Sequence, residues 1–355
     1  MGGNEKSILI YVAHPYGGLE GDDNLKVLNQ KIEEFYSIYH GDNVEVLKGI
    51  PDSSIHYSIF SPPFANLYTY SNSDRDMGNS KNDDEFYEHF KYLIKELYRV
   101  TMPGRLLSFH CMDLPMMKSR DGVIGLKDFP GELIRLFADA GFIYHSKVVI
   151  WKDPLVEATR TKSLGLMHKQ LVKDSAMCRQ GLPDYLITMR KPGENPEKVE
   201  NLKGLMRFFG ENEPEGMKEQ RPSQDPEKYA KKEKYNKIPI YSHQAWRRYA
   251  SPVWMDISQS NTLNKKAARE EKDERHICPL QLDVIARGIE LWTNPGDIVL
   301  DPFVGLGSTN YVALRMDRRT IGIELKESYY NLTLSNCEKA MEEPIIEDDE
   351  SWSFK

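Results

Sequence analysis

The sequence predicts an α/β protein whose core is a largely parallel sheet covered by helices. Apolar segments with strand-like alternation are separated by segments with helical spacing between residues 55 and 151, and again between 280 and 323. In the last third, the apolar segment 298–300 leads directly into a glycine-rich turn and then into a helical segment. Such a turn between a strand and a helix is typical of a ligand site at the carboxyl ends of parallel strands.

The composition is that of a globular protein. Of the 355 residues, 40% are hydrophobic, and no apolar run approaches the roughly 20 residues of a membrane helix. The four cysteines lack C-x-x-C spacing, which argues against a zinc site and against a disulfide framework. We therefore expect a cytoplasmic protein with no membrane contact and no metal site.

The charge is unevenly distributed along the chain. The net charge is −7, but residues 342–355 carry six acidic residues and one lysine, so we expect an acidic, solvated tail at 341–355. Basic residues gather in the middle third, where segments 152–183 and 190–275 interleave lysines and arginines with aromatic residues and prolines. Solvated surface charge is the simplest interpretation of any single lysine. A basic, aromatic insertion inside an α/β protein is nonetheless typical of nucleic-acid recognition.

The first 37 residues are predicted to form an extension ahead of the sheet. Residues 7–16 have the pattern of a strand followed by a glycine-rich turn. The segment 24–37 is predicted to be a helix because four apolar side chains have helical spacing, namely Leu25, Leu28, Ile32 and Phe35.

The apolar alternation of residues 55–60 ends in Ser61-Pro62-Pro63-Phe64. Neither proline offers a backbone N–H, so the strand cannot continue, and a rigid elbow follows that presents carbonyls, a hydroxyl and an aromatic ring. Taken alone, such a tetrad is most simply a stiff loop. The polar segment 65–80 is predicted to be a loop, and loops of this length in compact domains are usually functional or disordered.

The remaining elements continue the alternation of strands and helices, with a helix stop at Met102-Pro103-Gly104. We expect helices at 83–100, 131–140, 280–292 and 309–316, and strands at 105–111, 143–151, 184–189, 298–300 and 320–323.

The turn from Asp301 to Thr309 differs from the common phosphate-binding patterns. It has neither the G-x-G-x-x-G of dinucleotide sites nor the lysine of a phosphate loop. Glu324, at the end of the next strand, is placed to accept hydrogen bonds from both hydroxyls of a ribose. The pattern favours an adenosine-type ligand without a pyrophosphate.

Two separated motifs carry a family resemblance. Asp-Pro-Phe-Val-Gly-Leu-Gly-Ser-Thr at 301–309, followed by Gly-Ile-Glu at 322–324, resembles the S-adenosylmethionine motif of amino-directed DNA methyltransferases, and Ser-Pro-Pro-Phe at 61–64 resembles their catalytic motif. The catalytic motif comes first, an order that resembles the beta group of the family, which includes restriction-modification and phage enzymes. The resemblance spans about residues 38–337.

The resemblance implies a Rossmann-like methyltransferase sheet with a circularly permuted motif order and an inserted target-recognition region. It divides the chain into an N-terminal extension (1–37), a catalytic half (38–151), a target-recognition insertion (152–275, with the returning strand 184–189), a cofactor half (276–340) and the acidic tail (341–355).

The resemblance also implies S-adenosyl-L-methionine as cofactor and double-stranded DNA as substrate, with the target base flipped out of the duplex. Ser61 Oγ and the Pro62 carbonyl would accept hydrogen bonds from the exocyclic amine, and Phe64, beyond Pro63, would stack on the base. A cognate restriction endonuclease is a potential partner. The expected cofactor residues are Asp301, Pro302, Phe303, Gly305, Gly307, Ser308 and Glu324, with Asp42 and Pro279 as further candidates, and the expected DNA-binding residues are Lys169, Lys173, Arg247 and Arg248.

The first residue of the catalytic motif bears on the target base. In the family, Asp or Asn at this position goes mostly with adenine N6 and Ser mostly with cytosine N4, so Ser61 favours cytosine N4, with adenine N6 as the alternative. Carbon-5 methylation is disfavoured because it needs a thiolate, typically after a proline, and none of the four cysteines follows one. The alternative from another class is a non-catalytic nucleic-acid-binding protein with a degenerate methyltransferase fold, and the intact motifs argue against it.

Overall fold

The protein is described by a computed structural model that covers most of the chain. The described residues are 27–64, 83–116, 118–161, 164–201, 204–205, 207–211, 240–263 and 280–346. The strand predicted at 7–16, the loop predicted at 65–80 and Pro279 lie outside these residues.

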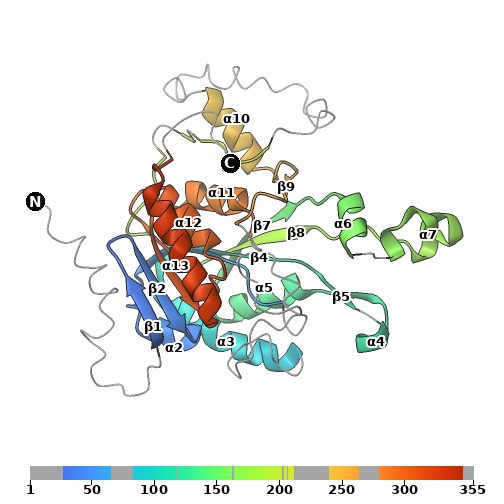
Figure 1. Cartoon of the computed structure of the whole chain (residues 1–355), viewed down its shortest axis with the longest axis horizontal. Helices are drawn as coiled ribbons and strands as arrows, with labels where there is room; N and C mark the ends of the chain where they lie inside the picture. The colour runs from blue at the N-terminus through green and yellow to red at the C-terminus, as the bar shows by residue number, and fades with distance from the viewer. Residues whose placement is uncertain are drawn as a thin grey trace, which may run out of the picture.

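A nine-stranded sheet forms the centre of the molecule (Figure 1). The five strands from β2 to β4 run parallel, whereas β1 pairs antiparallel with β2, and β8 pairs antiparallel with both β4 and β7. The predicted α/β class with a largely parallel sheet is confirmed. In spatial order the strands are β1 (Val27–Ile32), β2 (Tyr36–Gly41), β11 (Arg319–Glu324), β10 (Ile298–Asp301), β3 (Ile55–Phe60), β4 (Thr101–Cys111), β8 (Asp184–Arg190), β7 (Ile143–Ile150) and β9 (Val253–Trp254).

Helices cover both faces of the sheet, so that two apolar cores lie on either side of it. One core takes its side chains from α2 (Asn43–Lys48), α3 (Asp83–Val100) and α5 (Phe129–Asp139). The other takes them from α10 (Ile240–Tyr249), α11 (Leu282–Trp292), α12 (Ser308–Arg315) and α13 (Glu327–Glu342). Strand β3 serves both cores because successive side chains of a strand point to opposite faces.

Two smaller units project from the sheet at the right of Figure 1. One is the hairpin of β5 (Leu114–Met116) and β6 (Gly125–Lys127), with α4 (Lys118–Asp121) between its strands. The other is an arm that contains α6 (Pro154–Thr161), α7 (His168–Lys173) and the short turns Leu164–Leu166 and Ser175–Met177. We call residues 153–183 the α6–α7 arm.

The predicted helices at 83–100, 131–140, 280–292 and 309–316 are confirmed to within two residues, as are the strands at 143–151, 184–189, 298–300 and 320–323. The strand predicted at 105–111 begins earlier, at Thr101. Pro103 and Gly104, expected to separate helix from strand, lie in an irregularity where the pairing of β3 with β4 shifts register, and Gly104 has a φ of 72°. A bulge accommodates a residue without an N–H and a residue with positive φ without ending the strand.

The helix predicted at 24–37 is wrong, because residues 27–41 form the hairpin of β1 and β2. Of the side chains that suggested the helix, Leu28 and Phe35 are exposed. Every residue of β2 is buried, because this strand continues the parallel sheet beside β11. Both strands therefore belong to the main sheet, and the expected boundary at residues 37–38 falls inside β2.

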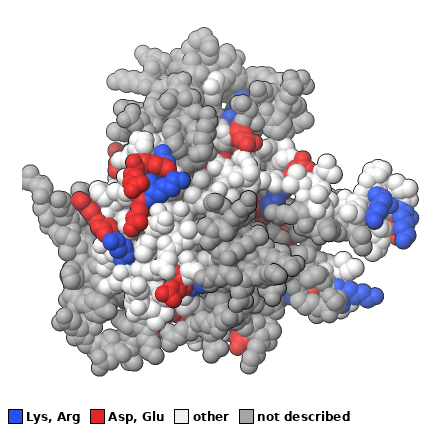
Figure 2. All heavy atoms as spheres, viewed as in Figure 1, with Lys and Arg blue, Asp and Glu red and all other residues white. Residues whose placement is uncertain are grey.

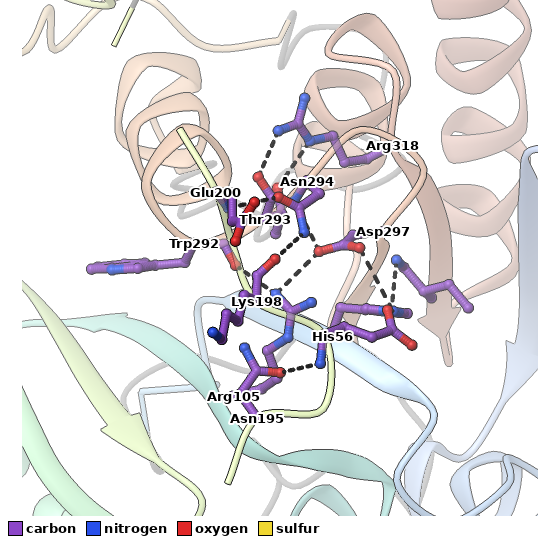
Figure 3. A network of polar contacts seen from close by, with 12 residues as sticks. His56, Arg105, Asn195, Lys198, Glu200, Trp292, Thr293, Asn294, Asp297 and Arg318 are labelled. Carbon is purple, nitrogen blue, oxygen red and sulfur yellow. Dashed lines mark hydrogen bonds and ion pairs between the residues drawn. The ribbon is translucent and has the colours of Figure 1, made fainter. Parts of the chain in front are cut away.

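A polar network fixes the amino-terminal edge of the sheet (Figure 3). The Arg105 guanidinium on β4 is 2% exposed, and it pairs at 3.1 Å with Asp297, which comes just before β10. His56 on β3 accepts a hydrogen bond from the Ile298 N–H at Nδ1, so its other nitrogen, Nε2, carries the proton and faces Glu197 at 3.0 Å. Although His56, Glu197 and Asp297 lie close enough to hold a metal ion, their polar atoms are engaged with one another and with the backbone. The network is a structural anchor.

Helix α11 packs very closely on β3 at Gly288. A Cβ at this position would lie 2.6 Å from the Tyr57 hydroxyl oxygen, which is itself buried and donates to Ser108 Oγ at 2.8 Å. We expect Gly288→Ala to lower the free energy of unfolding by about 1–3 kcal/mol, because overpacking forces the helix or the ring to move. Denaturant unfolding measures this change. In a Tyr57→Phe background, which removes the clashing oxygen, the cost of Gly288→Ala should fall, and an equal cost in both backgrounds would contradict the expectation.

Candidate active site

The two sequence motifs meet at the carboxyl-terminal edge of the sheet. Asp301 is the last residue of β10, Glu324 is the last residue of β11, and Ser61 directly follows β3. The chain leaves β10 through α12 toward β11 and leaves β3 through α3 toward β4, so the strand order reverses between β10 and β3. Ligands of open α/β sheets bind in the crevice at such a reversal.

The cofactor loop, residues 301–307, is held in shape by hydrogen bonds to its backbone. Glu324 Oε2 accepts a hydrogen bond from the Gly305 N–H at 2.8 Å, and Thr333 Oγ1 on α13 donates to the Gly305 carbonyl at 2.9 Å. Asn336 Nδ2 donates to the Leu306 carbonyl at 2.7 Å. Because helix α13 and the end of β11 fix the loop before any ligand arrives, the site is preorganised.

The glycines of this loop have distinct roles. Gly305 and Gly307 have φ values of 55° and 82°, a region that favours glycine. A Cβ at Gly307 would lie 3.1 Å from Thr333 Cγ2, so this glycine permits the close packing of α13. A Cβ at Gly305 would contact only the Phe303 carbonyl, at 3.9 Å, among the described atoms. Gly305 thus borders open space, where a ligand can approach the backbone.

Two carboxyl groups at this edge of the sheet have raised pKa values. Burial raises the pKa of Asp301 to about 7, although the Phe303 N–H donates a hydrogen bond to its carboxyl group. Burial also raises the pKa of Glu324 to about 7, against hydrogen bonds from the Lys326 and Gly305 N–H groups. The Glu324 side chain remains partly accessible, so a ligand can reach it.

Ser61 is the first member of a chain of polar contacts. Its Oγ lies 3.1 Å from Nδ1 of His110, the penultimate residue of β4. His110 Nε2 lies 3.1 Å from Oδ2 of Asp184, the first residue of β8, and Lys152 Nζ lies 2.5 Å from Oδ1 of the same carboxylate. His110, Asp184 and Lys152 were not predicted as site residues from the sequence. The only sequence signal was their position at strand ends, because the spatial neighbourhood of β4 and β8 cannot be derived from the chain order.

Comparisons with known proteins agree with this geometry. The family model described as DNA methylase, of the N6/N4 methyltransferase type, matches residues 9–335. The chain belongs to this DNA methylase family. Type II methyltransferase M.BglII of Bacillus subtilis is 24% identical over 322 residues, which cover 89% of this chain and 73% of the relative.

Solved structures show the same fold. A putative DNA modification methylase of Thermus thermophilus, in complex with S-adenosyl-L-methionine, matches with a TM-score of 0.54 and 19% identity over 86% of this chain and 95% of the other. PvuII DNA methyltransferase (cytosine-N4-specific) matches with a TM-score of 0.53 and 19% identity over 87% of this chain and 90% of the other. The predicted Rossmann-like methyltransferase fold and the resemblance to S-adenosylmethionine-dependent DNA amino-methyltransferases are confirmed, and S-adenosyl-L-methionine is the cofactor that family membership assigns to the chain.

The other predicted cofactor residues of the methylase surround the same loop. Pro302 is buried, and its carbonyl accepts a hydrogen bond from Asn43 Nδ2 at 3.2 Å. Asp42 caps α2 by accepting from the Glu45 N–H at 3.1 Å, which places it beside Asn43 near the loop. Phe303 stacks on Phe90 of the core, with ring centroids 6.3 Å apart.

Ser308 opens helix α12 of the methylase. Its hydroxyl is buried and has no hydrogen-bond partner among the described residues. A polar ligand group in the crevice would satisfy it.

Phe64 does not occupy the expected place. Its side chain is 8% exposed and packs in the apolar core edge-on to Phe129 of α5, with ring centroids 6.3 Å apart. Burial of this aromatic side chain among apolar neighbours stabilises its position. Stacking of Phe64 on a base stays a prediction, and it would require the ring to leave its packing against Phe129.

The four predicted DNA-binding residues lie in two different settings. Lys169 and Lys173 are exposed on α7, and Figure 2 shows blue side chains at the tip of the α6–α7 arm. Arg248 is engaged internally, since its Nη2 pairs with Asp256 at 2.7 Å and its guanidinium lies over the Phe208 ring. Arg247, on the same helix, is partly buried.

Among the described residues, none of the helices has the length and apolar character needed to cross a bilayer.

We expect the affinity of the methylase for S-adenosyl-L-methionine to rise as the pH is raised from 6 to 8. With a pKa near 7, Glu324 is largely protonated at the lower pH and ionised at the higher, and the carboxylate accepts hydrogen bonds from hydroxyls more strongly than the neutral acid does. Isothermal titration calorimetry measures the dissociation constant. Glu324→Gln should weaken binding and reduce the pH dependence, whereas Glu327→Gln, on the exposed start of α13, should change neither. An unchanged pH profile in Glu324→Gln would contradict the expectation.

Proposed function

We propose that this methylase transfers a methyl group from S-adenosyl-L-methionine to the exocyclic N4 amine of cytosine in duplex DNA. The observation that carries the proposal is the position of Ser61, whose hydroxyl oxygen lies at the carboxyl edge of β3 across the strand reversal from the cofactor loop. Thr309 Oγ1, at the start of α12, donates to the Ile59 carbonyl at 3.2 Å and so ties the cofactor side of the crevice to the catalytic strand.

The segment Ser61 to Phe64, which follows β3, would supply hydrogen-bond acceptors for the exocyclic amine. An exocyclic amine is a poor nucleophile because its lone pair is delocalised into the ring. Ser61 Oγ and the Pro62 carbonyl accept its two hydrogen atoms, draw the nitrogen toward tetrahedral geometry and free the lone pair. Pro62 and Pro63 are buried, so both acceptors are held in place before the base arrives. The cofactor supplies an electrophilic methyl group when it is bound.

The cofactor loop would hold that group in line with the amine. Glu324 would accept hydrogen bonds from the ribose hydroxyls, and the backbone at Gly305 would lie against the ligand. Asp301 and Ser308 would line the crevice from β10 and the start of α12. Alignment of the two reactants contributes a large share of the rate in reactions of this kind.

Cytosine N4 is favoured over adenine N6 by the serine at position 61. A serine hydroxyl is a neutral acceptor, and in the family a serine here goes mostly with cytosine N4. PvuII DNA methyltransferase, which shares the fold, is named as cytosine-N4-specific. Adenine N6 remains the alternative.

The α6–α7 arm would contact the duplex. It projects beyond the sheet and carries Lys169 and Lys173 on an exposed helix (Figures 1 and 2). Phosphate contacts from such lysines position a protein on DNA without reading its sequence. The base would leave the stack to enter the crevice beside Ser61.

The test is to identify the methylated nucleoside. The full chain is incubated with labelled S-adenosyl-L-methionine and plasmid DNA, and the DNA is digested and analysed by chromatography with mass spectrometry. We expect N4-methylcytosine, which must be separated from its isomer 5-methylcytosine. N6-methyladenine would support the alternative, and label in RNA or in free nucleosides alone would contradict DNA as substrate. Ser61→Ala should lower turnover by about 100-fold or more, with little change in cofactor affinity.

Charge reversal on α7 should weaken DNA binding. We expect Lys169→Glu/Lys173→Glu to raise the dissociation constant for duplex DNA and to reduce the slope of log affinity against log salt by about 1–2, because each lost phosphate contact contributes roughly 0.9. Fluorescence anisotropy at several salt concentrations measures both quantities. The matched control is Lys91→Glu/Lys95→Glu, an exposed pair with the same spacing on α3. Equal losses in both double variants would remove α7 from the interface.

A further inference from the structure

We propose that His110 and Asp184 are positioning residues, which hold the Ser61 hydroxyl in the orientation where its oxygen accepts a hydrogen bond from the target amine. The inference rests on the proposed function of Ser61 and deepens it. A hydroxyl can both donate and accept, so its value as an acceptor depends on where its own proton points.

Topology brings the three residues to one place. Ser61 follows β3, His110 lies at the end of the adjacent parallel strand β4, and Asp184 begins β8. Because β8 runs antiparallel to β4, its first residue lies at the same edge as the last residues of β3 and β4. Lys152, two residues beyond the end of β7, reaches this edge from the next strand.

Asp184 is the fixed acceptor of the group. It is 3% exposed, and its two oxygens lie 3.1 Å from His110 Nε2 and 2.5 Å from Lys152 Nζ. Burial alone would raise the pKa of Asp184, but the contacts of its carboxyl group with His110 and Lys152 more than offset burial and lower the pKa below its usual value. Asp184 is therefore ionised at neutral pH and can only accept.

The carboxylate selects the tautomer of His110. The ring nitrogen that faces an ionised carboxylate carries a proton, which places it on Nε2, although this contact is bent away from ideal hydrogen-bond geometry. In the neutral ring Nδ1 then has a lone pair, and it accepts the Ser61 O–H at 3.1 Å. With its proton directed at His110, Ser61 Oγ presents its lone pairs to the crevice.

A purely structural role would have a different signature. His110 is 5% exposed and joins β3 to β8, so its loss could lower stability without touching the reaction. The two roles separate because a positioning residue acts only through Ser61, whereas a structural residue acts whether or not the hydroxyl is present.

The first experiment is a double-mutant cycle on the full chain. We expect His110→Ala to lower kcat on duplex DNA by about 10- to 100-fold with little change in cofactor affinity, and to have no further effect in a Ser61→Ala background. His110→Asn, which can place an amide oxygen near the position of Nδ1, should recover part of the loss. His56→Ala, a histidine of β3 at the opposite edge of the sheet, should combine additively with Ser61→Ala.

Additive losses for His110→Ala and Ser61→Ala would overturn the proposal. If Ser61→Ala methylates DNA at the wild-type rate, the proposed function of Ser61 fails, and the positioning role toward the amine fails with it.

The second experiment needs no methyl transfer and separates the two failures. Nitrogen-15 NMR of the full chain without DNA reports which nitrogen of His110 is protonated, with the signal assigned by its loss in His110→Asn. We expect protonation on Nε2 and an unprotonated Nδ1, and a shift away from this tautomer in Asp184→Asn. Protonation on Nδ1 in the wild type would overturn the inference even if the protein proves to be an active methyltransferase.

Discussion

The parallel pairing of β3 with β10 is the contact on which the proposed active site depends. Val299 pairs with Tyr57 and Leu300 with Ser58, so the ends of both strands are held in register. The catalytic and cofactor motifs lie far apart in the sequence, and this short ladder, with the hydrogen bond from Thr309 to the Ile59 carbonyl, places them side by side. Any change that separates β3 from β10 therefore disrupts the catalytic and cofactor sides together.

The polar groups at the two edges of the sheet differ in their surroundings. At the amino-terminal edge, Arg105 on β4 pairs with Asp297 ahead of β10, and His56 on β3 accepts a hydrogen bond from the Ile298 N–H, so these contacts join the starts of the strands. At the carboxyl-terminal edge, burial raises the pKa values of Asp301 and Glu324, so both carboxyl groups hold a proton more readily than a solvated carboxyl group does. Groups with shifted pKa values cluster at functional sites.

Much of the fold and part of the site could be predicted from the sequence. The buried strands, the amphipathic helices and the glycine-rich turn have strong local patterns, and Asp301, Gly305, Gly307 and Glu324 were expected at one crevice, where the structure places them. The N-terminal hairpin was not predicted because Leu28 and Phe35 contribute to a helical spacing of apolar residues. In the structure both side chains are exposed to solvent.

The rest could not be predicted for a physical reason. His110, Asp184 and Lys152 belong to three strands whose neighbourhood is decided by tertiary pairing, so no spacing in the sequence relates them to Ser61. The burial of Phe64 and the internal pairing of Arg248 likewise depend on side chains from remote segments, here Phe129 and Asp256.

The two ends of the α6–α7 arm are joined to each other as well as to the sheet. Lys152 immediately precedes the arm and Asp184 immediately follows it, and these two residues form an ion pair at 2.5 Å. Within the arm, Glu157 accepts a hydrogen bond from the Leu182 N–H at 2.9 Å, so the base of the arm is closed a second time. The base of the arm is thus closed by an ion pair and by a hydrogen bond. A substitution on α7 therefore leaves the ion pair that joins the end of β7 to the start of β8 in place.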